Sequence, residues 1–458
     1  MNSKKILGPF LFIGLLLFGW VLKFGYFFSD DFYWLYQAQR ISGFSDVLFF
    51  KISTYHSPVL NFFYYVFYNL FYYQAHWYFL ATILVHILVA YFLFLFIYKI
   101  TKKKSISLFS AMFFLLAGSA YEPIFWIAAN LHVFATIFIL LFIYFYWQFL
   151  NTHKIKHFII SFLFFLLAIN TKEIAFISIF LMLATYLFFK FKNKETRAYI
   201  YNKILVFLIF IVTIVFGFLE YIWQRNSPAI NSGYWQLDFS QFLRWPVIIV
   251  DTIIPFFRWI NIDNYFYIYT LSLILIISLI YFLKKSLLFW YGLSWILIAS
   301  LPTIFAVDKL WMPLASRYTY LLKIGTVFIL CALLARLLKK VPKKIVYIFI
   351  FSLFVYNVFY WVNIVKKDYP YVYQSGRALK EVVLKIAPQN PANIFMVRPL
   401  PFEGNTAHIV GAFSTLMDYP KEKIIFIDQE NLPENPNGII VYWDHQKRVY
   451  FFEDLSQK

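Results

Sequence analysis

The sequence predicts an α-helical, polytopic membrane protein, and three observations lead to this fold class. Hydrophobic residues make up 62% of the 458 residues and charged residues only 14%, which is more apolar surface than a water-soluble domain can bury. Runs of about twenty apolar residues alternate with polar or basic clusters, as membrane-spanning helices do. Lys and Arg gather in every second connection between these runs, as they do in cytoplasmic loops.

Eleven spans follow from the length and apolarity of the runs. The first run has no cleavage site of small residues, so we expect it to be a retained helix that also serves as the insertion signal. The expected spans are 6–28, 77–98, 105–120, 131–150, 158–170, 175–190, 200–222, 266–283, 286–302, 320–335 and 345–363.

Basic residues divide the connections into two sets. Those on the side of the N-terminus hold 19 Lys and Arg in 36 residues, whereas those on the other side hold 8 in 123. This division predicts a cytoplasmic N-terminus and an extracytoplasmic tail in the cell or cytoplasmic membrane. Of the 11 acidic residues before residue 364, only Glu195 lies on the inner side, so chemistry that needs carboxylates is expected on the outer face.

The net charge of +19 belongs to the membrane part, because residues 364–458 hold 11 basic and 11 acidic residues. We interpret its basic clusters as anchors that contact anionic membrane lipid, and not as a surface for nucleic acid. Single lysines at helix ends, Lys23, Lys309 and Lys323, are expected to be interfacial anchors of the same kind.

Two domains are expected, a membrane domain over 1–363 and a small extracytoplasmic α/β domain over 364–458. The first has apolar outer stretches at 58–73 and 242–260, which we expect to be interfacial or re-entrant helices because full crossings there would destroy the charge alternation. The tail predicts a helix over 373–387 and then strands in NIFMV, KIIFI, GIIVYW and RVYFF, separated by Pro, Asn and Gly.

Ionisable residues stand next to aromatic ones in four outer turns. The adjacent carboxylates of Asp30 and Asp31 are the most unusual, because they repel each other at the membrane surface and need a cation, a metal or a catalytic task to compensate. The other turns carry Glu122, Asn130 and His132, then Lys172 and Glu173, then Arg317 and Tyr318.

The motifs in these turns resemble the GT-C class of polytopic glycosyltransferases, and in particular bacterial relatives of the protein O-mannosyltransferases. The acidic pair in FSDDFYWL is similar to the acidic motif that follows the first helix in that class. Similar motifs follow in order in YHSPVLNFFYYVFYNLF, HWYFLATILVHILVAYFLF, YEPIFWIAANLHVFATIF, NTKEIAF and SRYTYLLKIG. One departure is His56-Ser57-Pro58, where relatives usually have Arg-Pro.

The resemblance implies transfer of a hexose or pentose from a polyprenyl-phosphate donor to a hydroxyl of a glycan, glycolipid or protein on the outer face. An inverting reaction needs a base for the acceptor proton, and we expect Asp30 or Asp31 in that role. Arg317 and Lys172 are expected to neutralise the donor phosphate. We expect Glu122, Glu173, His56 and Tyr318 to position the substrates. No cofactor is implied with certainty, and a divalent metal ion is possible.

Two other classes stay open. A transporter or flippase would also be polytopic, but it would be expected to carry charges at mid-helix depth or broken helices in matched halves. A polysaccharide polymerase or ligase also has many helices and a large outer loop, although acidic residues directly after the first helix are not typical of it.

Overall fold

A computed structural model describes residues 4–49, 57–116, 121–193, 200–224, 245–253, 265–306, 316–386, 389, 391–398, 412–413, 423–431, 438–444, 447 and 449–454. Its helices are α1 (Lys4–Phe18), α2 (Val21–Phe24), α3 (Asp30–Gln39), α4 (Phe44–Phe49), α5 (Pro58–Phe71), α6 (Ala75–Thr101), α7 (Lys104–Leu116), α8 (Glu122–Phe125), η2 (Ile127–Ala129), α9 (Leu131–Thr152), α10 (Ile155–Ile169), η3 (Glu173–Ile177), α11 (Ser178–Asn193), α12 (Ile200–Gln224), α14 (Trp245–Ile253), α15 (Tyr265–Leu283), α16 (Leu287–Ala306), α17 (Ser316–Thr319), α18 (Leu322–Lys340), α19 (Lys343–Ile386) and η9 (Gln429–Asn431).

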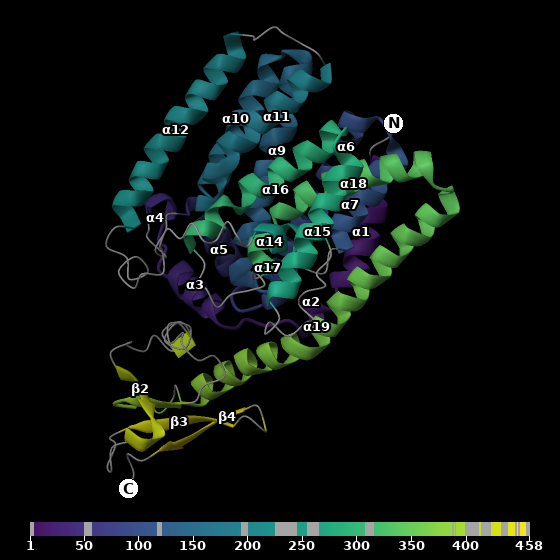
Figure 1. The fold of residues 1–458 in the computed structure, drawn as a ribbon. Helices are drawn as coiled ribbons and strands as arrows, with labels where there is room; N and C mark the ends of the chain where they lie inside the picture. The colour runs from purple at the N-terminus through teal and green to yellow at the C-terminus, as the bar shows by residue number, and fades with distance from the viewer. Residues whose placement is uncertain are drawn as a thin grey trace.

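The helices form one bundle with a small sheet beyond its end (Figure 1). Six described stretches are long and apolar enough to cross a membrane: Ala75–Thr101, Ile127–Thr152, Glu173–Asn193, Ile204–Ile222, Phe266–Leu283 and Lys343–Asn363. Four more are apolar but shorter: Ile6–Phe18, Lys104–Leu116, Ile155–Ile169 and Leu287–Pro302. Each expected span contains a helix among the described residues, so the fold class is confirmed, while the count of eleven crossings stays a prediction.

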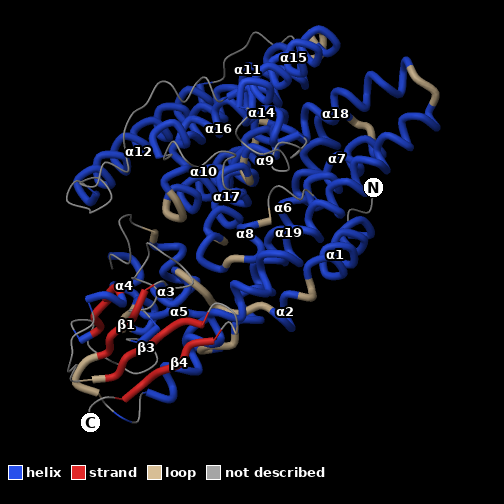
Figure 2. The backbone as a smooth tube through the Cα atoms, turned by 60° about the horizontal axis from the view of Figure 1, so that its bottom comes forward, coloured by secondary structure: helices blue, strands red, loops and turns tan. Residues whose placement is uncertain are grey.

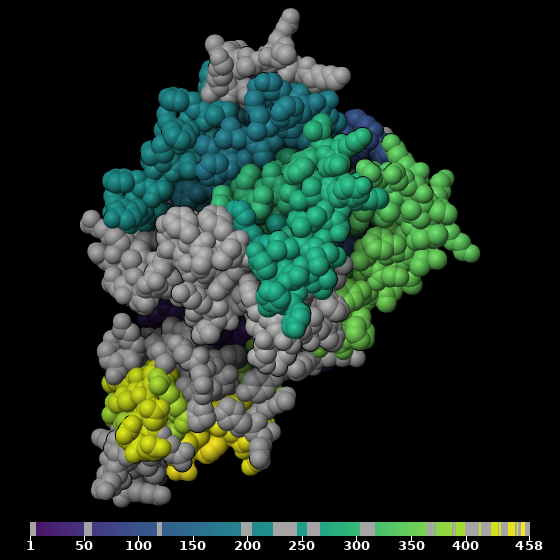
Figure 3. Space-filling view, viewed as in Figure 1, coloured from purple at the N-terminus to yellow at the C-terminus, as the bar shows by residue number. Residues whose placement is uncertain are grey.

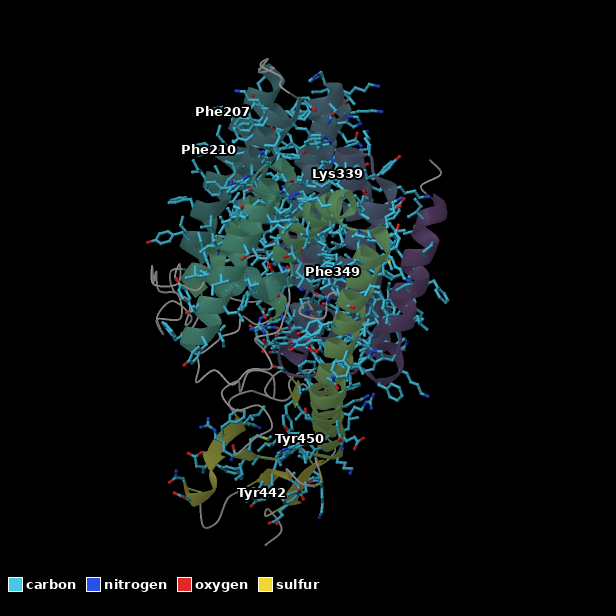
Figure 4. All side chains as sticks on the ribbon, turned by 45° about the vertical axis from the view of Figure 1, so that its right-hand side comes forward. Phe207, Phe210, Lys339, Phe349, Tyr442 and Tyr450 are labelled. Carbon is cyan, nitrogen blue, oxygen red and sulfur yellow. The ribbon has the colours of Figure 1, made fainter. Side chains whose placement is uncertain are left out.

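The outside of the bundle is apolar, as a surface in contact with lipid has to be. Phe207 and Phe210 of α12 are 62% and 51% exposed and lie at the edge of the bundle in Figure 4. Lys339, at the basic end of α18, lies on the far side of the bundle from Tyr442 and Tyr450 of the sheet in the same view. The bundle therefore has a basic end and an opposite end that adjoins the sheet.

Two glycines allow α16 and α18 to pack closely. A Cβ atom on Gly292 would lie 2.6 Å from the carbonyl oxygen of Gly325, and one on Gly325 would lie 2.5 Å from that of Gly292. Small residues permit this approach of two helix backbones, which is a common way to join helices in lipid. The contact matters for function because α17, with Arg317 and Tyr318, lies in the connection between these two helices.

The expectation that 6–28 is one continuous helix is wrong. Helix α1 ends at Phe18, α2 is a separate turn, and Gly25 continues in an extended conformation with φ −67° and ψ 147°. Both interruptions fall at glycines, which destabilise a helix interior because they add backbone freedom. The chain therefore reaches the acidic pair through two helical segments and an extended stretch, and not through one helix.

The tail contains the four expected strands, β1 (Ile394–Arg398), β2 (Ile424–Asp428), β3 (Ile439–Asp444) and β4 (Val449–Asp454). They form a sheet in the order β2-β1-β3-β4, in which β1 is parallel to β2 and β3, and β4 is antiparallel to β3 (Figure 2). The prediction that the last span, 345–363, and a helix over 373–387 are separate is wrong, because α19 runs unbroken from Lys343 to Ile386. The domain division at residue 363 stays a prediction, and it falls inside this helix.

The two expected interfacial stretches are both partly helical. Helix α5 buries Leu60 and Tyr64 and exposes Phe62 and Leu70 by 52% and 64%, which is an amphipathic pattern. Helix α14 buries every residue from 247 to 252 and packs on α15 and α18. Their depth in a membrane stays a prediction.

Candidate functional site

The acidic pair begins helix α3. Ser29, directly before it, has φ 50°, a region that non-glycine residues rarely adopt. The carboxylate of Asp31 stabilises this turn, because its Oδ2 accepts the backbone N–H of Phe28 at 3.0 Å and the Asp31 N–H donates to the Phe28 carbonyl at 3.1 Å. Acidic residues are favoured in the first turn of a helix, where N–H groups lack partners.

Asp31 also joins the start of α3 to the segment that carries α8 and η2. Its Oδ1 accepts the N–H of Ala128 in η2 at 2.6 Å, and its side chain is fully buried. Burial raises the pKa of Asp31 well above its ordinary value, against the two N–H bonds that lower it, and the charge of Asp30 raises it further. The two backbone donors thus offset only part of the cost of burying the Asp31 carboxylate, and the raised pKa favours its protonated form.

Asp30 has a different environment from Asp31. Its side chain is only partly buried, whereas that of Asp31 has no exposed surface. A group that takes a proton from a substrate has to reach that substrate. The two carboxylates, which the sequence could not distinguish, thus differ in their exposure in the structure.

Glu122 and Arg317 form an ion pair across 195 positions of sequence. Arg317 Nη1 contacts Glu122 Oε1, and the Arg317 backbone N–H donates to Glu122 Oε2 at 3.2 Å. The guanidinium also lies over the rings of Trp126, at 5.2 Å, and Tyr318, at 4.9 Å. Burial lowers the pKa of Arg317, but the charge of Glu122, together with Tyr318 and the hydrogen bonds to both side chains, raises it by more, so the pKa lies above its ordinary value and the guanidinium stays charged.

Lys172 and Glu173 form a second ion pair, with Nζ 3.1 Å from Oε1. Lys172 is 8% exposed, in the turn between α10 and η3. The segment before α5 packs on this turn, because Ser57 Oγ donates to the Thr171 carbonyl at 3.0 Å. Both cations expected to hold a phosphate thus already have a carboxylate partner.

We define an outer cluster by its residues: Asp30, Asp31, Glu122, Trp126, His132, Lys172, Glu173, Arg317 and Tyr318. Ring contacts join Trp126, Arg317, Tyr318 and His132, Lys172 is connected with them through its charge near His132, and Asp30 is included as the neighbour of Asp31. Phe28 stacks on Trp126 with ring centroids 5.7 Å apart, and Arg317 lies over the same indole. His132 meets Tyr318 edge to face at 5.7 Å and lies within electrostatic range of Lys172 and Arg317. In Figure 3 the purple atoms of the N-terminal region lie set back between the teal and green helices and the yellow sheet.

Seven of the eight expected site residues belong to the outer cluster, and the eighth, His56, lies outside the described residues. The metal expectation stays a prediction. Among the described residues, no group of three His, Cys, Asp or Glu side chains could hold a metal ion. Glu122, which we expected to position the substrates, pairs with Arg317. We therefore derive no step through a metal.

Helix α19 packs against the segments that carry the cluster, a contact that the sequence did not indicate. The buried hydroxyl of Tyr373 donates to the Phe125 carbonyl at 2.7 Å, next to Trp126. Arg377 Nη2 donates to the Phe24 carbonyl at 2.7 Å, and the backbone at Gly376 lies against the Phe27 carbonyl. One helix therefore contacts both the segment that precedes the acidic pair and the segment that carries Glu122.

One expectation about a cation is wrong. Lys323 is fully buried, so it does not extend to the interface as an anchor, and its Nζ donates to the Thr252 carbonyl of α14 at 3.2 Å. From the sequence alone, a lysine near the start of an apolar helix is expected to be an interfacial anchor. The sequence does not show that α14, from another part of the chain, covers Lys323. Lys23 is exposed, as expected, and Lys309 lies outside the described residues.

No family model matches this chain, and no curated protein matches it. Among solved structures, it is similar to the crystal structure of ArnT from Cupriavidus metallidurans bound to undecaprenyl phosphate. The identity is 12% and the TM-score 0.44, with 97% of this chain and 94% of that chain covered. A likeness at this TM-score carries no argument about this chain, so function has to be argued from the outer cluster.

Proposed function

We propose that the protein is a membrane glycosyltransferase that moves a sugar from a polyprenyl-phosphate donor to an acceptor hydroxyl on the extracytoplasmic face. The observation that carries the proposal is the outer cluster. Carboxylates, cations and aromatic rings from four turns meet there, although the turns lie as far apart in sequence as Asp30 and Tyr318. These are the groups that the transfer of a sugar from a phosphate requires.

Asp30 is the base in this proposal. The acceptor hydroxyl gives its proton to a carboxylate while its oxygen bonds to the anomeric carbon from the face opposite the phosphate, and the bond from that carbon to the phosphate oxygen breaks with its electron pair. The products are an inverted glycoside and a polyprenyl phosphate. Asp31 has both oxygens bonded to backbone N–H groups and no exposed surface, so we assign it to positioning.

Arg317 and Lys172 stabilise the phosphate as it leaves, because both are cationic side chains in a partly water-excluded place. A guanidinium has five N–H donors, so Arg317 can hold the Glu122 carboxylate and a phosphate oxygen together. Glu122 and Glu173 then position the cations as well as the substrates. Tyr318 offers a ring for a sugar face, and His56 keeps its proposed positioning role.

A transporter or flippase is the second candidate, and two observations favour it. The first helix is broken between α1 and α2, and Lys323 is fully buried against α14. A broken helix and a buried charge occur in proteins that carry polar substrates through a membrane, although Lys323 lies in the first turn of α18 and not at mid-helix depth. They lie outside the outer cluster, so a test of that cluster separates the two candidates.

The test is sugar transfer by the purified protein from a panel of radiolabelled polyprenyl-phosphate hexoses and pentoses to extracted cell-envelope acceptors. Wild type is compared with Asp30→Asn and with Asp46→Asn as the matched control, because Asp46 lies in α4, where its side chain bonds to Ser42. We expect transfer that Asp30→Asn reduces by at least about a hundredfold and Asp46→Asn preserves. Equal transfer by wild type and Asp30→Asn would reject the base, and no transfer from any donor would reject the function.

A further inference from the structure

Helix α17, which carries Arg317 and Tyr318, is only four residues long. A single turn of helix is not stable by itself, because few hydrogen bonds offset the cost of ordering its backbone. The direction of the Arg317 side chain therefore depends on the contacts at each end of α17. At the start of α17, the backbone N–H of Arg317 donates to Glu122 of α8 at 3.2 Å.

The turn Tyr320–Leu321 follows α17, and two side chains of the bundle hold this turn. His86 of α6 contacts the Tyr320 hydroxyl, with its Nδ1 2.6 Å from the oxygen. Trp295 of α16 donates from its indole nitrogen to the Leu321 carbonyl at 3.2 Å. Tyr320 has no exposed surface, so water does not reach its hydroxyl to take the place of His86.

A second hydrogen bond of the His86 ring determines which nitrogen carries the proton. Its Nε2 lies 3.1 Å from the Leu115 carbonyl of α7, and a carbonyl can only accept. Nε2 therefore carries the proton, and in the neutral ring Nδ1 accepts from the Tyr320 hydroxyl. The ring also packs against Phe18, edge to face at 5.3 Å, and against Phe114 at 5.6 Å. His86 is thus held by α1 and α7, and it offers the Tyr320 hydroxyl an acceptor in a fixed place.

The position of its partner distinguishes His86 from a histidine that only stabilises the fold. Tyr320 is three residues after Arg317, and its N–H donates to the Arg317 carbonyl at 3.4 Å. A hydrogen bond to the Tyr320 side chain therefore also holds the backbone that carries the guanidinium. The buried pair of Tyr291 and Thr185 is different, because its hydroxyls, 2.8 Å apart, join α16 to α11, and neither helix carries a residue of the outer cluster.

We propose that His86 is a positioning residue, which fixes the orientation of α17, and with it Arg317, through the Tyr320 hydroxyl. His86 is 1% exposed, so it acts through Tyr320 and not on a substrate. The consequence for sugar transfer rests on the proposed function, whereas the effect on α17 does not.

The experiment combines a readout that does not depend on activity with two that test the consequence. A fluorotyrosine replaces Tyr318 alone in the full-length protein, and its fluorine NMR resonance reports the surroundings of α17 in detergent. The transfer rate at a low concentration of the donor that the panel identifies and the melting temperature are measured on the same variants.

The variants separate loss of the hydrogen bond from loss of stability. His86→Phe removes the acceptor, and the double variant His86→Phe/Tyr320→Phe removes both partners. His86→Asn keeps an acceptor near the position of Nδ1. The matched control is Tyr291→Phe, which removes a tyrosine hydroxyl from the buried hydrogen bond with Thr185.

We expect His86→Phe to lower the melting temperature, because it leaves the buried Tyr320 hydroxyl without an acceptor. The double variant should recover most of this loss, because both partners are then apolar. Its transfer rate should stay at least about tenfold below that of the wild type, and its fluorine resonance should stay shifted or broadened, because α17 is no longer held. His86→Asn should recover part of the transfer rate. Tyr291→Phe should lower the melting temperature without changing the resonance or the rate.

A transfer rate at the wild-type level in the double variant would show that His86 only stabilises the fold, and would overturn the proposal. A fluorine resonance that His86→Phe leaves as in wild type, or that Tyr291→Phe shifts equally, would overturn it as well. A resonance that responds as expected in a protein that transfers no sugar from any donor would leave the positioning of α17 standing and reject the proposed function.

Discussion

Helix α19 contacts the segment that leads into Asp30 and Asp31, and this contact tests whether α19 positions the outer cluster. A Cβ atom at Gly376 would lie 1.8 Å from the Phe27 carbonyl oxygen and 3.0 Å from its carbon. Both neighbours are backbone atoms, so no side-chain rotation can make room. Gly376→Ala therefore has to move either α19 or the segment that leads into Asp30 and Asp31.

The size of the movement follows from the contact distance. An ordinary Cβ contact begins near 3.4 Å, so the alanine needs a displacement of about 1.5 Å at this point. Forcing an extra methyl into a packed contact costs about 1–3 kcal/mol of unfolding free energy. A shift of about 1 Å at a reacting group costs about a hundredfold in rate, because the acceptor and its base no longer align.

The assay compares Gly376→Ala with Gly217→Ala, a substitution in α12 where no atom lies within 4 Å of the added Cβ. We expect Gly217→Ala to match wild type in melting temperature and in the initial rate of sugar transfer, or to exceed its stability slightly, because alanine favours helix. Gly376→Ala should show a lower melting temperature and a rate reduced by about a hundredfold. If both alanine variants behave alike, α19 does not position the acidic segment and the reasoning is refuted.

Three further predictions concern single groups and the topology. Because burial raises the pKa of Asp31, the folded protein keeps this proton to a higher pH than the unfolded chain does. The melting temperature of the wild type should therefore fall as the pH rises above about 4. Thermal melts across this pH range should show that Asp31→Asn lacks this part of the fall. Arg317→Lys keeps the positive charge beside Glu122 but loses the paired N–H donors of the guanidinium, so the KM for the donor should rise about tenfold while the melting temperature stays near that of the wild type. An unchanged KM would show that Arg317 does not bind the donor phosphate. A reporter fused after Asp454 should be active only outside the cytoplasm, and cytoplasmic activity would contradict the assigned orientation and the outer face.

The sequence predicted the elements of this fold better than their ends. Apolar runs indicated where the helices lie, and alternating apolar residues bounded by Pro, Asn and Gly indicated all four strands of the tail. The break at Gly19 and the unbroken course of α19 to Ile386 were missed. The break falls at a glycine, a local signal that was present in the sequence, whereas α19 is held by tertiary contacts such as that between Tyr373 and the Phe125 carbonyl.

For the candidate site, residue types were easier to predict than partners. The pair of Lys172 and Glu173 is local, and an ion pair there was foreseeable from two adjacent residues. The pair of Glu122 and Arg317 depends on the approach of α8 and α17, which no local pattern encodes. Asp31 accepts the N–H of Ala128, and a backbone partner of this kind cannot be identified from the sequence.

The most direct test of the central claim measures the stoichiometry of sugar transfer by the wild-type protein in sealed vesicles. The vesicles carry one labelled polyprenyl-phosphate sugar on the membrane face at which the outer cluster lies. Sugar bound to acceptor and free polyprenyl phosphate are measured in the same sample. The account predicts one polyprenyl phosphate formed for each sugar transferred, and neither product with Asp30→Asn. Intact lipid-linked sugar that moves to the other face, with no free polyprenyl phosphate formed, would contradict the account and favour a transporter.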